Sequence, residues 1–394
     1  MKRVLVLDAN QRSALATTRS LGKHNITVIT ADESITALSG NSRFSSHYYQ
    51  YPSPSNTPEQ FITTISRIAK THNISIILPM TELTTTLLLQ YQQSFSGIII
   101  PCPSQKIINK LSDKSTLMQL AKQLSIPFPK TWFIDTPDNL NLSLSDLPYP
   151  LVLKPSKSWI KQDGKWLHTT VRFADNPEQA QTIIKSDPAF QSHTFMIQER
   201  VEGTGQGVFA LYDRGKPIAF FSHKRLREKP PWGGVSVLSE SVEVNPILLA
   251  HAKTLLDSTK WHGIAMVEFK VADDGTPYLM EVNTRFWGSL QLSIDSGVDF
   301  PWLLYKMVQG ESVESIQNYT KGNRLRWILG DIDSLYISLR QKDNTIKQKL
   351  TAILDFLTSS PFRTKHEVNR WGDLKPFYWE LKKYIRDLLH NSRS

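Results

Sequence analysis

Tyr278-Leu-Met-Glu-Val-Asn-Thr-Arg285-Phe-Trp-Gly-Ser-Leu290 lies beyond the middle of the chain, and Val267-Glu-Phe-Lys270 shortly precedes it. Both runs alternate apolar and polar residues, which is typical of strands with one buried face, and Asp273-Asp-Gly275 between them favours a hairpin turn. If the last two residues of that turn form a two-residue loop, Glu268 lies directly opposite Glu281 on one face of the hairpin. The sequence therefore predicts a pair of facing carboxylates.

Asn283 lies two residues farther along this face, and Arg285 follows on the same side. Like charges directly opposite one another destabilise a sheet, so a cation between Glu268 and Glu281 is favoured. Two carboxylates and an amide oxygen suit Mg2+, with Mn2+ as the alternative. An arbitrary Glu-x-Asn is more often a solvated pair on a sheet surface, but an arginine beside a metal site is what phosphoryl transfer requires. We expect Glu268, Glu281 and Asn283 to bind the metal.

This pattern, Glu268 followed by Glu281-x-Asn-x-Arg285 and then Phe-Trp-Gly-Ser289, resembles the metal-binding signature of the ATP-grasp superfamily. The resemblance is to carboxylate-amine ligases, with an ATP-binding domain like those of carbamoyl-phosphate synthase and biotin carboxylase. It covers the chain up to residue 310 and implies a fold of mixed α/β and α+β class. Four domains are expected. Residues 1–110 form a Rossmann-like parallel-sheet domain, and residues 111–195 and 196–310 form the N-terminal and C-terminal ATP-grasp subdomains. Residues 311–394 form a basic, mostly helical extension outside the resemblance.

The segment from residue 1 to residue 110 alternates short apolar runs with helical patterns. Val4–Asp8 and Ile26–Ile29 are predicted strands, joined by a helix at Ser13–Gly22 that ends at a glycine cap. Later strands are predicted at 74–78 and 97–100. Right-handed crossovers then give an open parallel sheet of about five strands. The first turn lacks Gly-x-Gly-x-x-Gly, so no dinucleotide site is predicted. Polar residues that follow the strands are candidate substrate contacts, namely Asn10, Arg12, Thr81 and Glu82.

Two lysines are candidate phosphate ligands. Lys154 ends an apolar strand, and Lys114 lies in the first turn of a predicted helix. A lysine at the end of a buried strand needs an anionic partner. ATP-grasp proteins have a similar Pro-x-x-x-Lys-Pro strand, so the resemblance assigns Lys154 and Lys114 to the nucleotide phosphates. The loop at 155–164 lacks the clustered glycines usual in such proteins, and Lys157 and Lys161 are expected to supply charge in their place.

Phe195–Gly203 resembles the hinge that holds adenine in ATP-grasp proteins. Extended backbone can pair with the edge of a purine, and Met196 and Val201 can cover its faces. Many relatives place a ribose-binding glutamate after the hinge, whereas this chain has Thr204-Gly-Gln206, so the ribose contact shifts to Gln206 or is absent. The nucleotide-binding residues that the resemblance implies, besides the two lysines, are Gln198, Glu199, Val201, Gln206 and His223.

The most basic segment is His223-Lys-Arg-Leu-Arg-Glu-Lys229-Pro-Pro-Trp-Gly-Gly234. Clusters of this kind are most often solvated faces or nucleic-acid patches. Its place after a predicted strand, with Pro-Pro and Gly-Gly at its end, favours a loop that folds over triphosphate or substrate. The resemblance places Arg225 near the transferred phosphoryl group and Arg285 near charge at the acyl centre, which makes them the expected catalytic residues.

The extension at 311–394 contains fifteen Lys and Arg against ten Asp and Glu, together with several aromatic residues. Phe377–Leu389 has the periodicity of an amphipathic helix. Such a helix either docks on its own domain or lies on an anionic membrane surface, and we expect docking.

Composition limits the class of protein. The chain has 394 residues, 40% of them hydrophobic, a net charge of +10 and a single cysteine, Cys102. One cysteine excludes an internal disulfide framework and a cysteine metal cluster, and it suits a reducing compartment, so the cytoplasm is the expected location. The positive charge favours anionic partners without choosing among nucleotide, acidic substrate, nucleic acid and membrane surface.

The resemblance implies that the γ-phosphoryl group of ATP is transferred to a carboxylate, and that an amine then attacks the acyl phosphate. The expected protein is thus an ADP-forming carbon–nitrogen ligase that uses ATP and Mg2+ and acts on a small carboxylate and a small amine. Two alternatives stay open: a non-catalytic protein that binds ATP or a metabolite, and a module that binds membrane or, less favoured, nucleic acid through its basic tail. The identities of the two substrates and the oligomeric state are not encoded in any motif.

Overall fold

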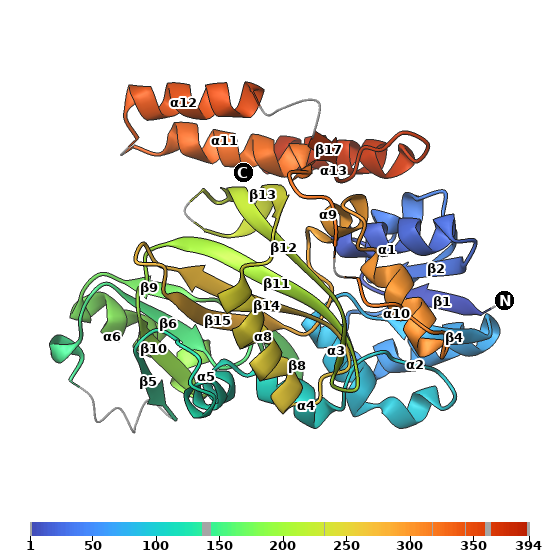
Figure 1. The fold of residues 1–394 in the computed structure, drawn as a ribbon, viewed down its shortest axis with the longest axis horizontal. Helices are drawn as coiled ribbons and strands as arrows, with labels where there is room; N and C mark the ends of the chain where they lie inside the picture. The colour runs from blue at the N-terminus through green and yellow to red at the C-terminus, as the bar shows by residue number, and fades with distance from the viewer. Residues whose placement is uncertain are drawn as a thin grey trace.

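The computed structural model describes residues 2–135, 143–231, 233–316, 318–342, 344–358 and 364–391. Figure 1 shows three layers of structure side by side: an N-terminal parallel sheet, a large and mostly antiparallel sheet across the centre, and a smaller antiparallel sheet on the opposite side. Helices of the C-terminal extension lie across one end of the large sheet and of the N-terminal domain. The large sheet therefore lies between the smaller sheet and the N-terminal sheet.

The N-terminal sheet has the strand order β3-β2-β1-β4, and all of its pairings are parallel. Its central strand comes from the buried apolar run Val4–Leu7. The prediction of about five strands was wrong in two details: residues 97–100 contribute only a bridge from Ile99 to Ile76, and the polar edge strand at 45–50 has no apolar run to reveal it. The elements are β1 (Arg3–Val6), α1 (Arg12–Lys23), β2 (Thr27–Asp32), β3 (Ser45–Gln50), α2 (Pro58–Thr71), β4 (Ile74–Leu78) and α3 (Glu82–Gln90).

The expected glycine cap of the first helix was also wrong. α1 continues past Gly22 to Lys23, and Asn25 adopts the positive φ of 58° that reverses the chain. Asparagine tolerates this conformation better than most residues.

The smaller sheet has the order β5-β10-β6-β9 and is antiparallel. Its central strand β6 is fully buried, and it places Lys154 opposite Met196 of β10. A separate hairpin, β7-β8, follows β6. The elements of this region are α4 (Gln105–Ser112), α5 (Lys114–Gln123), β5 (Thr131–Ile134), β6 (Leu151–Pro155), β7 (Trp159–Gln162), β8 (Lys165–His168), β9 (Arg172–Ala174), α6 (Pro177–Ser186), α7 (Pro188–Gln191) and β10 (Phe195–Glu199).

The large sheet has the order β15-β14-β11-β12-β13-β16-β17. Its last two strands come from the C-terminal extension, which therefore continues the central sheet. The elements are β11 (Thr204–Asp213), β12 (Lys216–Lys229), β13 (Val235–Val242), α8 (Pro246–Ser258), β14 (Gly263–Val271), β15 (Pro277–Asn283), α9 (Leu290–Asp295), α10 (Phe300–Val308), β16 (Arg324–Arg326), α11 (Ile328–Arg340), α12 (Ile346–Leu357), β17 (Thr364–His366) and α13 (Lys375–Asn391).

The predicted basic loop at 223–234 was wrong over most of its length, because β12 runs as a strand to Lys229. Its cations are paired with acidic side chains of neighbouring elements. Arg227 contacts Asp331 of α11, with Nη2 and Oδ2 2.6 Å apart, and Lys229 pairs with Asp333 of the same helix. The apparent loop is thus a strand to which a helix of the extension is bound by ion pairs.

The prediction that the basic amphipathic helix docks on its own chain is confirmed for the first turns of α13. Trp379 donates its Nε1–H to Thr36 Oγ1 at 3.0 Å, and Glu380 accepts the indole N–H of Trp327 at 2.9 Å. Phe377 and Trp379 pack against a small core around the buried Leu38. None of the described helices combines the length and apolar content that crossing a bilayer requires.

Candidate active site

The carboxylate hairpin is formed by β14 and β15, and Glu268 pairs with Glu281 as predicted. The predicted two-residue loop was wrong. The strands are joined by Ala272–Thr276, in which the N–H of Thr276 donates to the Asp274 side chain at 2.8 Å. The longer turn offsets the pairing by one residue, and a β-bulge between Glu268 and Phe269 restores it. Both glutamates therefore face the same side of the sheet.

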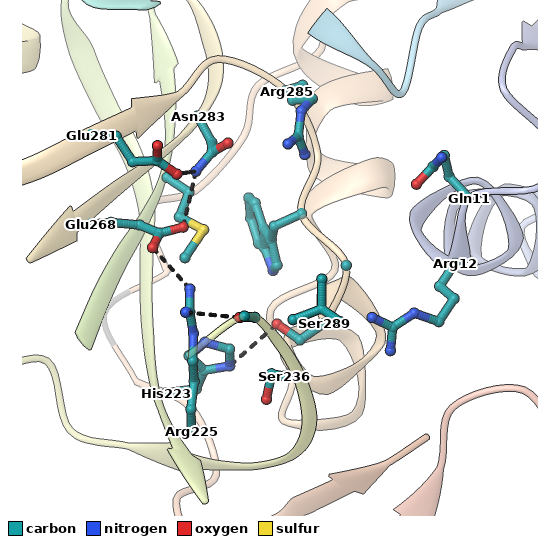
Figure 2. Close-up of a pocket in the computed structure, with 15 residues that line it drawn as sticks. Gln11, Arg12, His223, Arg225, Ser236, Glu268, Glu281, Asn283, Arg285 and Ser289 are labelled. Atoms are coloured by element: carbon teal, nitrogen blue, oxygen red, sulfur yellow. Dashed lines mark hydrogen bonds and ion pairs between the residues drawn. The ribbon is translucent and has the colours of Figure 1, made fainter. Parts of the chain in front are cut away.

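Asn283 joins the two carboxylates. Its Nδ2 donates to Glu268 Oε1 at 2.9 Å and to Glu281 Oε1 at 3.1 Å, as Figure 2 shows. Arg225, which reaches across from β12, donates from Nη2 to Glu268 Oε2 at 2.9 Å. The Glu268 carboxylate raises the pKa of the Arg225 guanidinium above its ordinary value. Nitrogen donors from two strands thus converge on the acidic pair.

The two carboxyl groups differ in their pKa. Burial raises the pKa of Glu268 more than Arg225 lowers it. Burial acts in the same direction on Glu281, but the ammonium groups of Lys114 and Lys154, together with the Asn283 hydrogen bond and Arg285, outweigh it and lower the pKa of that carboxyl. Two carboxylates that share one site commonly titrate apart in this way. Glu281 is therefore the firmly ionised member of the pair.

Lys154 and Lys114 approach this cluster from the smaller sheet and from the start of α5. Burial lowers the pKa of Lys154 to about 8, and the charge of Glu281 only partly offsets that effect. Lys114 Nζ lies 3.4 Å from the hydroxyl of Ser158. A buried ammonium group whose charge is poorly compensated favours binding of an anion. Lys157 and Lys161 lie on the segment that follows β6 and in β7.

The donor set fits a hard divalent cation. Within the part of the chain that the structure describes, no group of three or more histidine, cysteine or acidic side chains forms a metal site, so the candidate ligands are two carboxylates and an amide. Glu268 Oε1 and Glu281 Oε1 converge on the Asn283 amide group, which carries an acceptor oxygen next to the nitrogen that it presents here. Carboxylate and amide oxygens are the ligands that Mg2+ prefers.

The segment expected to hold adenine lies where β10 passes into β11. Gln198 is buried and donates to Thr131 Oγ1 at 2.9 Å, while its Oε1 has no hydrogen-bond partner among the described residues. Glu199 is exposed, whereas Val201 and Gln206 are partly buried. Gly203 ends the hinge with a φ of +140°, and a Cβ there would lie 2.2 Å from a backbone oxygen of the large sheet, so this position requires glycine.

A cavity of about 330 Å3 opens beside the carboxylate pair. Figure 2 shows Arg285 on the same side as Asn283, Arg12 and Gln11 opposite, and His223 with Ser289 below. The expected phosphate lysines and hinge residues are not part of its lining, whereas His223, another expected nucleotide-binding residue, is. Its lining comprises Gln11, Arg12, His223, Arg225, Gly234, Val235, Ser236, Met266, Glu268, Glu281, Asn283, Arg285, Trp287, Gly288 and Ser289.

His223 forms part of the cavity wall and is not exposed as a loop residue would be. Its Nδ1 lies 3.3 Å from Ser289 Oγ, and its ring contacts Phe209 edge-on at 4.7 Å between centroids. Burial and the neighbouring Arg225 lower the pKa of His223 to about 3, so the imidazole is neutral at physiological pH.

Of the four residues proposed as substrate contacts at the strand ends, only Arg12 lines this cavity. The Asn10 amide is occupied by Asp32 and Ser34, at 2.8 and 2.9 Å. Thr81 caps α3, and Glu82 is the first residue of that helix. Sequence reasoning gave no role to Trp287 and Ser289, although they belong to the recognised pattern.

The comparisons with known proteins agree with this geometry. Residues 191–330 match a family model described as "ATP-grasp in the biosynthetic pathway with Ter operon". This segment contains the Glu268–Glu281 hairpin. A comparison with curated protein sequences found no significant match.

Several solved structures share the fold. Biotin carboxylase from Campylobacter jejuni, in a complex with β-γ-ATP, aligns with a TM-score of 0.64 at 14% identity over 82% of this chain and 74% of that one. L-amino acid ligase from Bacillus licheniformis aligns with a TM-score of 0.61 at 14% identity over 78% and 73%. The biotin carboxylase domain of 2-oxoglutarate carboxylase from Hydrogenobacter thermophilus, in complex with MgADP, ADP and bicarbonate, gives 0.64 at 15% identity over 82% and 73%. The chain shares the fold of these structures, and residues 191–330 match an ATP-grasp family model, as predicted.

Proposed function

We propose that the protein is an ATP-dependent carboxylate-amine ligase that forms an amide or peptide bond through an acyl phosphate and releases ADP and phosphate. The observation that carries the proposal is the buried carboxylate pair, Glu268 and Glu281, with Lys114 and Lys154 close enough to lower the pKa of Glu281. A site with paired carboxylates, lysines and free arginine donors suits a phosphorylated ligand bound together with a cation. The family match and the ATP-bound neighbours support the same assignment.

In this proposal the residues divide into those that bind nucleotide and those that face the reacting groups. Lys154 and Lys114 bind the phosphates, and the segment from Gln198 to Gln206 holds the base and ribose. Glu268, Glu281 and Asn283 would hold Mg2+. Bound there, the cation would neutralise charge on the outer phosphates of ATP.

Arg285 and Arg225 are the proposed catalytic residues because they project toward the space beside the carboxylates. Among the described residues, Arg285 donates only from Nη1 to the backbone oxygen of Phe286, at 3.1 Å. Its remaining N–H groups are available to a substrate carboxylate and to the negative charge that develops at the acyl centre. Arg225 can stabilise the phosphoryl group that is transferred.

The chemical steps balance without a protein nucleophile. An oxygen of the substrate carboxylate attacks the γ-phosphorus, the bond from that phosphorus to the β–γ bridging oxygen breaks, and ADP leaves. The amine nitrogen then attacks the acyl carbon, loses a proton to solvent, and phosphate departs with the bonding electron pair. Cys102 has no part in this chemistry, because burial raises the pKa of its thiol to about 12.

The test is ADP release by the purified full chain with ATP and Mg2+, screened against pooled amino acids and small carboxylates with and without an amine. Mass spectrometry identifies the product, and hydroxylamine traps an acyl phosphate as a hydroxamate. ADP and phosphate formed only with an acid present, together with a hydroxamate, would support the proposal. AMP and pyrophosphate would overturn the roles given to Lys154, Arg225 and Arg285, and ATP binding without turnover for any acid would favour a non-catalytic ATP-binding protein.

A further inference from the structure

The cavity beside the carboxylate pair has a donor-rich wall that the proposed ligase chemistry does not use. Figure 2 shows Arg12 on the opposite side of the cavity from Glu268 and Glu281. Trp287, which carries the indole Nε1, and His223, which carries the imidazole Nε2, also line the cavity. Both atoms are buried and have no hydrogen-bond partner among the described residues. Buried polar atoms are rarely left unpaired, so unpaired atoms in a cavity wall indicate where a ligand supplies the partner.

Arg12 is fixed in place by the C-terminal extension. It is the first residue of α1, and its Nη1 pairs with the buried carboxylate of Glu367. Its guanidinium carbon lies 4.1 Å from the centroid of the Trp327 ring, which covers one face of the group. Two residues of the extension therefore hold an N-terminal arginine at the cavity.

This ion pair leaves part of the guanidinium unused. An arginine side chain carries five N–H donors. Among the described residues, Nη1 is the only Arg12 side-chain nitrogen that donates a hydrogen bond, and it donates to Glu367. Gly288 leaves room beside the group, because a Cβ there would lie 3.1 Å from Arg12 Nη2. Arg12 lines the cavity in addition to forming its ion pair with Glu367, so a structural role alone does not explain its position. The arrangement is that of an arginine positioned by one carboxylate and free to bind another.

From this wall we infer that the acid substrate carries a second anionic group, which Arg12 binds together with the indole N–H of Trp287 while the reacting carboxylate lies near Arg285. The inference rests on the proposed ligase function and narrows its substrate class to small acids with two anionic groups, such as acidic amino acids or phosphorylated acids. A cavity of about 330 Å3 accommodates a ligand of this size. Glu367 acts as a positioning residue because it reaches the substrate only through Arg12.

The test compares isosteric acids that differ in one charge. The wild-type protein is assayed for ADP release and hydroxamate formation with aspartate against asparagine, glutamate against glutamine, and O-phosphoserine against serine. We expect a higher kcat/KM for the dianionic member of at least one pair. The phosphoserine arm distinguishes a phosphate from a carboxylate as the second group.

Arg12→Gln should lower the ratio of kcat/KM between the dianionic acid and its neutral isostere by about tenfold to a hundredfold, because it removes a charge-assisted contact. Trp287→Phe keeps the ring and removes the indole donor, and it should lower the same ratio less. Glu367→Gln should shift the ratio through KM more than through kcat. Arg324→Gln, which breaks an ion pair with Glu240 away from the cavity, is the matched control and should leave the ratio as in the wild type.

Calorimetric titration of each acid into the protein with a non-hydrolysable ATP analogue gives a second readout that needs no turnover, and melting curves check that each variant is folded. Equal kcat/KM for both members of every pair, or a wild-type ratio in Arg12→Gln, would overturn the inference while leaving the ligase function intact. If no acid in the panel supports ADP release, both the inference about the second anionic group and the proposed ligase function are overturned.

Discussion

Asp331→Asn tests whether the ion pairs between α11 and β12 stabilise the molecule. Asp331 is fully buried and accepts three charge-assisted hydrogen bonds. Arg227 donates from Nε and Nη2 at 2.7 and 2.6 Å, and Arg326 donates from Nε at 2.6 Å. Asparagine keeps one acceptor oxygen but turns an N–H donor toward a guanidinium group. The substitution therefore removes the carboxylate charge that two partly buried guanidinium groups share.

Removal of one partner from a buried ion pair costs about 3 to 5 kcal/mol. An unfolding entropy of about 2.1 cal/mol/K per residue gives roughly 0.8 kcal/mol/K for 394 residues. If the chain unfolds as one cooperative unit, the melting temperature should fall by about 5 °C. Asp333→Asn is the control, because Asp333 is partly exposed and its ion pair with Lys229 should contribute about 1 kcal/mol or less, while asparagine keeps an acceptor oxygen for the Tyr384 hydroxyl.

Urea denaturation followed by circular dichroism measures the free energy of unfolding of both variants. Adding Arg227→Met to Asp331→Asn should recover part of the lost stability, because it removes one of the two guanidinium groups that faced the lost carboxylate. A loss below about 1 kcal/mol for Asp331→Asn, or a loss equal to that of Asp333→Asn, would refute the reasoning.

Further predictions concern the site and the extension. Glu281→Gln deletes a ligand charge at constant volume, so ADP release should disappear while the melting temperature stays near that of the wild type; full turnover at limiting Mg2+ would contradict the metal assignment. Lys154→Ala should weaken ATP binding roughly tenfold to a hundredfold, measured by titration calorimetry, and unchanged affinity would remove this lysine from the site. The pKa of Lys154 is about 8 in the folded protein, against 10.5 for an ordinary lysine, so much of its ammonium group is deprotonated at pH 9. Because bound phosphate favours the charged form, nucleotide binding at pH 9 should take up a proton that binding at pH 6.5 does not, as shown by calorimetry in buffers of different ionisation heat; equal proton uptake at both values would argue against phosphate contact. Truncation after Gln309 removes β16, which carries the buried Leu325, and should yield protein that is insoluble or melts at lower temperature; a truncated protein as stable as the full chain would show that the extension is a separate module.

The carboxylate pair was predictable because strand alternation fixes which side chains share a face. The side chains of Glu268, Glu281 and Asn283 point to the same face of the hairpin with the short loop. They also do so with the longer loop, provided that one extra residue in a strand compensates for the longer turn. The bulge beside Phe269 supplies it. The turn itself could not be predicted, since Asp274 forms a side-chain turn that competes with the two-residue loop favoured by Asp-Gly.

The basic segment was misread because its partners are distant in sequence. A run of cations with Pro-Pro and Gly-Gly at its end is typical of a loop, yet the acids that neutralise Arg227 and Lys229 lie 104 residues away in α11. Likewise, no local pattern predicts that Glu367 meets Arg12, a separation of 355 residues. Pairings between remote segments depend on tertiary packing, which single-sequence patterns do not contain.

The contacts between α1 and the extension have a consequence for how the molecule is made. Arg19 is buried and donates to Asp373 Oδ2 at 2.8 Å, across 354 residues of chain, and Arg12 meets Glu367 nearby. During synthesis on the ribosome, the N-terminal sheet and the hairpin of carboxylates emerge long before either acidic partner exists. Until those residues are translated, Arg12 and Arg19 lack their partners in the extension, and incomplete chains tend to associate or to recruit chaperones. The entropy cost of closing a loop grows only with the logarithm of its length. The long separation therefore does not prevent the Arg19–Asp373 pairing once residue 373 has been translated. Arg12 thus acquires its ion pair at the cavity only after residue 367 has been translated, although every residue that lines the cavity precedes residue 290.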